Sequence, residues 1–210
     1  MAKYFNFFPK TPYFIDDHSG LDFVTNIITR FKFINEIKNI ASAYFSYDNI
    51  SGETPETLAY KFYGSVERHW IILLFNEIID PQFDWYKDYY LFNHYIIEKY
   101  SSLGGMSYAM NTIKKYVIRE QRTINFYDGE KTITEDRETD ETEYTNFIPE
   151  TRTLVLANSN NFEVTITTSK FTQTIFEYET EENEKRRSIK IVKKEYISRI
   201  EEEFKKLASL

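Results

Sequence analysis

Apolar and polar positions alternate over residues 45–50, which predicts a short strand with one buried face. Thr54 and Pro55 then supply an N-cap and a first helical residue, so a helix is expected to run to about residue 63, where Gly64 ends it. A second helix, capped by Ser65, carries the run at residues 70–75, which is apolar on most sides and predicts burial. Pro81 restricts the residue before it to extended geometry, and a second strand is expected near residues 78–85.

The chain before this unit predicts an arm and a helix, residues 1–44. Pro9 and Pro12 exclude a continuous helix near the N-terminus, and the many aromatic residues there favour an extended arm lying on its own domain or on a neighbour. Over residues 21–43 the apolar positions fall on helical faces, with Asp22 as an N-cap. The alternation at residues 29–34 suits a strand equally well.

After this unit, residues 86–109 show aromatic and aliphatic positions at helical spacing, ended by Gly104 and Gly105. Residues 110–180 contain Thr-rich, β-branched, alternating runs, including one at residues 174–178, and predict an antiparallel β insertion. The acidic run at residues 135–143 is too polar to bury and is expected at an exposed loop tip.

The C-terminal residues 181–210 predict a strand at 188–192 and a helix from about 194 to 207. One face of that helix carries Ile197, Ile200 and Phe204, and the opposite face is charged. The apolar stripe could pack on the chain's own core or join helices of other subunits. The pattern leaves both possibilities open.

Composition narrows the class of protein. The chain has 210 residues, 18% of them aromatic, and a net charge of −7. The aromatic excess suggests rings that face partner proteins, although a biased codon usage would also produce it. Net negative charge disfavours a general nucleic-acid binder. No cysteine is present, and we expect neither a signal peptide nor a membrane span, hence an unexported protein of the cytoplasm.

Signatures of enzymes are missing from the sequence. The three histidines, at positions 18, 69 and 94, have no metal-ligand spacing, and no glycine-rich phosphate loop or nucleophile elbow occurs. Asp80, Asp84 and Asp88 recur every four residues, but Pro81 interrupts the helix that would align them for glycoside hydrolysis. We therefore predict no catalytic residues, no cofactor and no metal.

The segment at residues 45–85 resembles a LysM module in its strand, helix, helix, strand order and in its turns at residues 52–55 and 76–81. The run from His69 to Asn76, followed by Asp84 and Trp85, is similar to the LysM-like version in a baseplate wedge subunit of contractile-tailed bacteriophages. Residues 182–192 resemble the C-terminal end of the same family. The resemblance leaves the middle of the chain uncovered.

This resemblance implies a LysM-like βααβ module. Together with the flanking helices, the antiparallel β insertion and the C-terminal helix that the residue patterns predict, it gives an α+β fold. The resemblance also implies a structural protein of the virion tail baseplate, assembled in the host cytoplasm, that docks neighbouring wedge subunits and adjacent tail proteins and helps wedges join around the hub in a sixfold ring. We expect no nucleic-acid, membrane or glycan partner. The candidate partner-binding residues are Phe7, Phe8, Trp70, Phe83, Trp85, Ile197, Ile200 and Phe204.

The alternative is a carbohydrate-binding module of the kind that binds peptidoglycan. In LysM modules the sugar lies between the turn into the first helix and the loop after the second helix. The corresponding positions here are residues 52–55 and 78–81.

Overall fold

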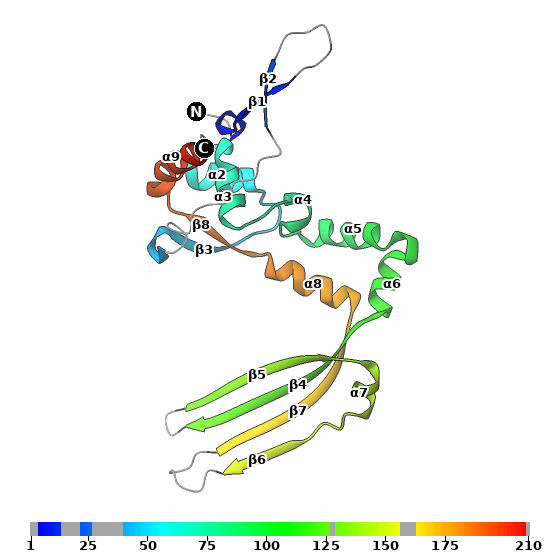
Figure 1. Ribbon diagram of the computed structural model, residues 1–210. Helices are drawn as coiled ribbons and strands as arrows, with labels where there is room; N and C mark the ends of the chain where they lie inside the picture. The colour runs from blue at the N-terminus through cyan, green and yellow to red at the C-terminus, as the bar shows by residue number, and fades with distance from the viewer. Residues whose placement is uncertain (1–3, 14–21, 27–39, 127–128, 156–162, 209–210) are drawn as a thin grey trace. The chain divides into compact units, whose positions relative to one another are not determined.

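The computed structural model describes residues 4–13, 22–26, 40–126, 129–155 and 163–208 (Figure 1). The fold is a mixture of helices and antiparallel sheets, as the sequence predicts. The chain divides into two compact units, which are described separately. Unit 1 comprises residues 1–90 and 183–210, and unit 2 comprises residues 91–182.

Unit 1 is built on a two-stranded sheet of β3 (Tyr44–Asp48) and β8 (Ser188–Val192). Helices α2 (Pro55–Tyr63), α3 (His69–Phe75) and α4 (Pro81–Asp84) follow β3, and η3 (Val66–Arg68) joins α2 to α3. After β8 come η5 (Lys194–Tyr196) and α9 (Ile197–Ala208). At the N-terminal end lie η1 (Tyr4–Phe7), the paired strands β1 (Lys10–Tyr13) and β2 (Asp22–Thr25), and η2 (Ala41–Ala43).

Helix α2 begins and ends as the sequence predicts. The Thr54 and Thr57 side chains each accept a hydrogen bond from the other residue's backbone N–H, at 3.3 and 2.8 Å respectively, which closes a capping box at the first turn. Pro55 occupies the first turn, where its missing N–H costs nothing. Gly64 takes the left-handed conformation at φ 71° and ends the helix.

The second strand predicted near residues 78–85 is wrong. Those residues contain the short helix α4, because Pro81 starts a helix that the Asp80 side chain caps by accepting from the Gln82 backbone N–H at 2.9 Å. The strand that pairs with β3 is β8, with Phe45 opposite Ile191 and Tyr47 opposite Ile189. Proline favours the first turn of a helix as readily as it favours extended geometry before it, so the local pattern could not decide.

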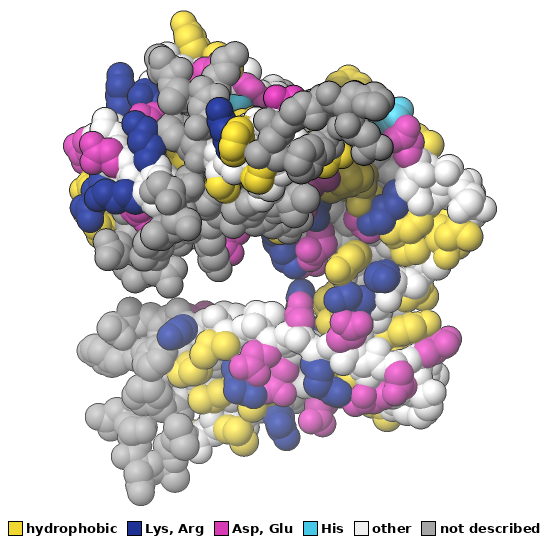
Figure 2. All heavy atoms as spheres, turned by 45° about the horizontal axis from the view of Figure 1, so that its top comes forward, with side chains coloured by type: hydrophobic (Ala, Val, Ile, Leu, Met, Phe, Trp, Pro, Cys, Tyr) yellow, Lys and Arg dark blue, Asp and Glu magenta, His cyan; other side chains and the backbone are white. Residues whose placement is uncertain are grey.

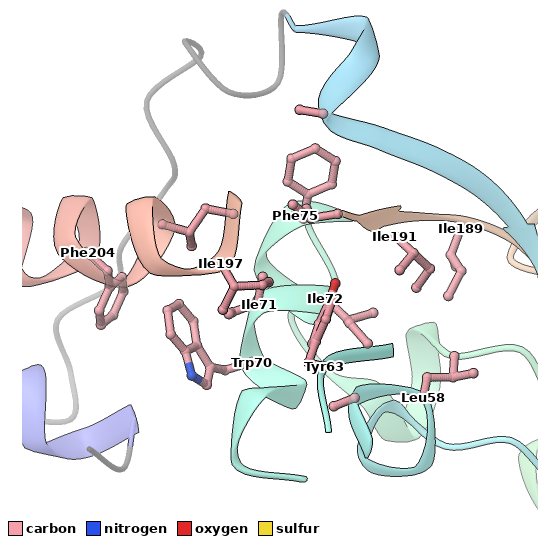
Figure 3. Packing of buried hydrophobic residues seen from close by; sticks show 14 of the residues in the cluster. Leu58, Tyr63, Trp70, Ile71, Ile72, Phe75, Ile189, Ile191, Ile197 and Phe204 are labelled. Carbon is pink, nitrogen blue, oxygen red and sulfur yellow. The ribbon is translucent and has the colours of Figure 1, made fainter. Parts of the chain in front are cut away.

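The core of unit 1 gathers side chains from α2, α3, β8 and α9 around the apolar run of α3 (Figure 3). Ile71 and Ile72 are fully buried, and Trp70 packs against Phe204 of α9 with 4.7 Å between ring centroids. The stripe of α9 therefore packs on the chain's own core, which decides between the two possibilities that the sequence left open. The prediction that α3 is buried is confirmed.

The N-terminal arm packs on the same core. The Tyr4 ring lies 5.4 Å from the Trp70 ring and 5.5 Å from the Phe204 ring, and Phe8 is buried. The helix predicted from residue 22 is wrong at its start, because residues 22–25 form strand β2. Residues 27–39, where the sequence suits a helix or a strand, lie outside the described residues.

Unit 2 contains a four-stranded antiparallel sheet in the order β5–β4–β7–β6. The strands are β4 (Ile113–Phe126), β5 (Gly129–Thr139), β6 (Thr151–Val155) and β7 (Glu163–Thr174), and α7 (Glu141–Asn146) lies between β5 and β6 in the chain. Helices α5 (Tyr89–Lys99), α6 (Gly105–Asn111) and α8 (Ile175–Lys185) are also present, and η4 (Ser101–Leu103) joins the first two. The predicted antiparallel β insertion is confirmed.

Three details of the prediction for unit 2 are wrong. Residues 175–178 belong to helix α8, which the Thr174 hydroxyl caps by accepting from the Glu177 N–H at 3.2 Å. The acidic run is mostly exposed, as predicted, but it forms the end of β5 and the start of α7: Arg119 of β4 pairs with Asp136 across the strands, and Arg137 of β5 pairs with Glu143 of α7. Gly105 begins α6, while α5 already ends at Lys99.

Candidate docking surfaces

Six of the eight candidate partner-binding residues lie in the core of unit 1. These are Phe8, Trp70, Trp85, Ile197, Ile200 and Phe204, and each is at most 7% exposed. Of the other two, Phe83 is 52% exposed, and the side chain of Phe7 lies outside the described residues. A protein that docks on the folded chain would meet Phe83 but not the six buried side chains, so a partner role for those six stays a prediction.

Trp85 is buried because its ring closes the gap between two segments that are distant in the sequence. Its indole Nε1–H donates to the Glu53 carbonyl at 2.9 Å. The Glu53 carboxylate in turn accepts from the Tyr47 hydroxyl at 2.7 Å and from Lys61 Nζ at 2.9 Å. The structure therefore brings the turn before α2 next to the residue that follows α4.

Partial burial tends to raise the pKa of Glu53, but the hydrogen bonds from Lys61, Tyr47 and the Ile50 N–H outweigh it and hold that pKa below its ordinary value. Glu53 thus stays ionised and keeps the strand β3 tied to α2 through Tyr47 and Lys61. The cluster is structural in character, since its groups are satisfied by one another.

Exposed apolar side chains gather in residues 79–90, which we call the α4–α5 segment. Tyr90 is 83% exposed and Phe83 is 52% exposed, and Ile79 and Tyr89 are also exposed. Figure 2 shows hydrophobic side chains reaching the surface among charged ones. Sequence reasoning named Phe83 and Trp85 as docking residues in this segment, and of the two only Phe83 is exposed. The signal it passed over is that Tyr90 lies off the helical stripe whose members Phe92 and Ile96 are buried.

The two turns that correspond to the sugar site of LysM modules, residues 52–55 and 78–81, use their polar groups in hydrogen bonds within the fold. The Thr54 hydroxyl and the Asp80 carboxylate each cap a helix, the Glu53 carbonyl accepts from Trp85, and the Asp84 carboxylate accepts from the Asp80 N–H at 3.2 Å. Pro55 is buried. These turns therefore offer fewer free polar groups for a glycan than their sequence suggests.

An open depression of about 410 Å³ lies where α3 meets β8. Tyr44, Phe75, Asn76, Glu77 and Lys190 line it. Its floor is fixed by Asn76, whose amide donates to the carbonyls of Ile72 and Lys190 at 2.9 and 2.8 Å and accepts from the Lys190 N–H at 2.8 Å. The Asn76 amide therefore joins α3 to β8 through these hydrogen bonds and is not available to bind a ligand in the depression.

Chemistry is sparse in the part of the chain that the structure describes. No group of three or more His, Asp or Glu side chains there could hold a metal ion. His69 Nδ1 lies 2.9 Å from the Val66 carbonyl, and His94 lies 3.5 Å from Glu98, whereas His18 is outside the described residues. No described helix is long and apolar enough to cross a membrane.

Comparison with known proteins points to a phage tail. The family described as base plate wedge protein 53 matches residues 3–207, which is nearly the whole chain. A search of curated proteins finds no match. Because the family spans both units and both ends of the chain, the protein belongs to the phage base plate wedge protein 53 family.

Proposed function

We propose that this protein is a non-enzymatic structural subunit of the virion tail baseplate, in which unit 1 is a LysM-like module that docks neighbouring wedge subunits. The docking would help wedges join around the tail hub in a sixfold assembly. The observation that carries the proposal is the α4–α5 segment, where Phe83, Tyr89 and Tyr90 are exposed beside a closed core. Large aromatic side chains dominate the energy of protein interfaces.

Support for the LysM-like character comes from the order of elements in space. Strand β3 is followed by α2 and α3, and the sheet is completed by β8. The second strand of the βααβ unit would then come from the C-terminal part of the chain. Unit 2 would be an insertion between the last helix of the module and its last strand.

Glycan binding is the less favoured role, because the turns at residues 52–55 and 78–81 use polar groups for helix caps and for the Trp85 hydrogen bond. Retention of the purified protein on peptidoglycan, lost on changing these turns, would reverse this ranking. A wedge protein should pass through such a column.

The proposal is tested by co-purification with the products of the neighbouring tail genes. Replacing both Phe83 and Tyr90 by Ala should weaken that association at least about tenfold, corresponding to about 1.4 kcal/mol or more. Gln82→Ala changes a side chain in the same segment and is the matched control. Both variants should keep the melting temperature of the parent, because the replaced rings are exposed. Unchanged association of the double variant would contradict docking through this segment.

A further inference from the structure

The sheet of unit 2 has two chemically different faces. Residues paired across an antiparallel ladder share a face, and successive residues alternate between faces. One face carries mainly threonine and other polar side chains, among them Thr123, Thr132, Thr153 and Thr165. The opposite face, which we call the aliphatic face, carries Ile118, Ile124, Ile133, Leu154, Val164 and Ile166.

Helix α7 packs on one end of the aliphatic face (Figure 1). The Tyr144 ring lies 5.1 Å from the Tyr116 ring, and Lys170 Nζ donates to the Tyr144 and Phe147 carbonyls at 2.8 and 2.9 Å. Lysine here satisfies carbonyls at the C-terminal end of the helix, where positive charge is favoured. This anchoring holds α7 over the rows of Tyr116 and Ile118, and the rows beyond them contain the exposed side chains of Ile133 and Leu154.

Two of those rows form what we call the open patch. Read across the strands from β5 to β6, the first row is Ile133, Arg122, Ile166, Arg152, and the second row is Lys131, Ile124, Val164, Leu154. Leu154 is 51% exposed and Ile133 is 36% exposed, Ile124 and Val164 are half-buried, and Ile166 between the two arginines is buried. A sheet face with aliphatic side chains is stable when a second layer covers it.

The positive charges of the open patch are balanced by carboxylates in the neighbouring row. That row carries Glu135 and Glu120, and Glu150 precedes β6 at the same level. Arg122 lies 2.5 Å from Glu120 and 3.6 Å from Glu135, and Arg152 lies 3.9 Å from Glu150. Three carboxylates thus offset Arg122, Arg152 and Lys131. The chain as a whole carries −7, and contact through a neutral region keeps the repulsion between two such copies low.

We propose that the open patch packs face to face against the open patch of a second copy of this chain. A two-fold axis running across the strands, between the two rows, gives an isologous contact. It places Ile166 of one copy over Val164 of the other, and Arg122 and Arg152 over Ile124 and Leu154. Ile133 falls over Lys131, so no two like charges face each other. Each Arg or Lys of the two rows thus faces an aliphatic side chain, against which its methylene stem can pack.

The contact is small. Four strands about 4.8 Å apart and two rows about 6.8 Å apart give roughly 260 Å² of sheet per copy. A standard interface buries about 800 Å² per partner. Association of free chains is therefore weak, with a Kd on the order of 1 mM. The contact lies in unit 2 and is separate from the docking proposed for unit 1.

Cross-linking tests this geometry cleanly because the chain contains no cysteine. Arg152→Cys and Leu154→Cys proteins, carrying different tags, are mixed and treated with a short bis-maleimide, since packed sheets lie about 10 Å apart. We expect mixed dimers in at least about tenfold higher yield than from Arg152→Cys mixed with Thr153→Cys. Thr153 is the matched control, because it lies on the same exposed strand and faces the other way. Equal yields from both mixtures would overturn the proposal.

Sedimentation equilibrium provides a second test. The average mass of the parent and of Thr153→Arg should rise with concentration towards about 1 mM. Leu154→Arg should remain monomeric, because it places a guanidinium over Arg152 of the other copy, so that like charges face each other. All three proteins should have the same melting temperature, since both replaced residues are exposed. A parent that stays monomeric throughout, or a Leu154→Arg protein that associates as the parent does, would refute the self-association.

Discussion

Substitutions of Trp85 test whether its ring belongs to the core of unit 1 or docks a partner protein. Its side chain is 7% exposed, and its Nε1–H donates to the Glu53 carbonyl at 2.9 Å. Replacing a buried Trp by Ala costs about 3–5 kcal/mol through lost burial and the cavity left behind. Trp85→Phe keeps an aromatic ring but leaves the carbonyl without its donor, which costs about 1–2 kcal/mol. The two variants should therefore destabilise unit 1 in graded fashion.

For a unit of about 120 residues, each kcal/mol lowers the melting temperature by roughly 4 °C. We expect Trp85→Ala to lower the transition of unit 1 by about 12–20 °C, and Trp85→Phe to lower it by about 4–8 °C, both followed by circular dichroism. Gln82→Ala, in the same segment, should leave the transition unchanged. A Trp85→Ala protein that melts with the parent but no longer co-purifies with tail proteins would refute the core assignment.

Three further predictions concern single contacts. Asn76→Ala should cost about 1–3 kcal/mol in urea unfolding, because it removes the side chain that bonds both the N–H and the carbonyl of Lys190. Glu77→Gly should stabilise unit 1 by up to about 1 kcal/mol, because Glu77 holds φ 58° just after α3, where glycine avoids the steric cost; a loss of stability would contradict this. Burial tends to raise the pKa of Glu179, but bonds from Lys99 and Tyr100 hold it below its ordinary value, so the stabilisation present above about pH 4.5 is lost as pH falls through the folded pKa. Glu179→Gln should remove that part of the acid dependence in melting curves recorded from neutral pH downwards, and an unchanged pH profile would contradict it.

Local signals predicted the elements of the chain well wherever the cause is local. The start and end of α2 follow from Thr54, Pro55 and Gly64, which act within a few residues of their own position. The strands of unit 2 follow from alternation and β-branching. The errors occur where a residue outside the segment decides the outcome, as when Arg119 of β4 pairs with Asp136 and holds the acidic run in β5.

The candidate docking residues show the same limit. Large aromatic and aliphatic side chains are favoured both in cores and at the centres of interfaces, so composition alone cannot separate the two. Trp70 and Phe204 are buried because η1 and α9, nearly two hundred residues apart in sequence, close over α3. Phe83 is exposed because the short helix α4 places it in solvent. The residues next to an aromatic side chain in the sequence do not show whether it will be buried in the core or exposed at the surface.

The pairing of β3 with β8 also sets the order in which unit 1 can become complete. Ile189, Ile191, Ile200 and Phe204 supply buried side chains to the core around α3, yet they come after the whole of unit 2 in the chain. Bringing together segments about 140 residues apart carries a loop-closure cost that contacts within α2 and α3 do not have. If the sheet and helices of unit 2 form first, the flexible chain between β3 and β8 becomes shorter, because unit 2 then joins the two segments as one folded body. The loop-closure cost falls accordingly. Early folding of the inserted unit would thus assist the assembly of the core that it interrupts, whatever its surfaces contact in the baseplate.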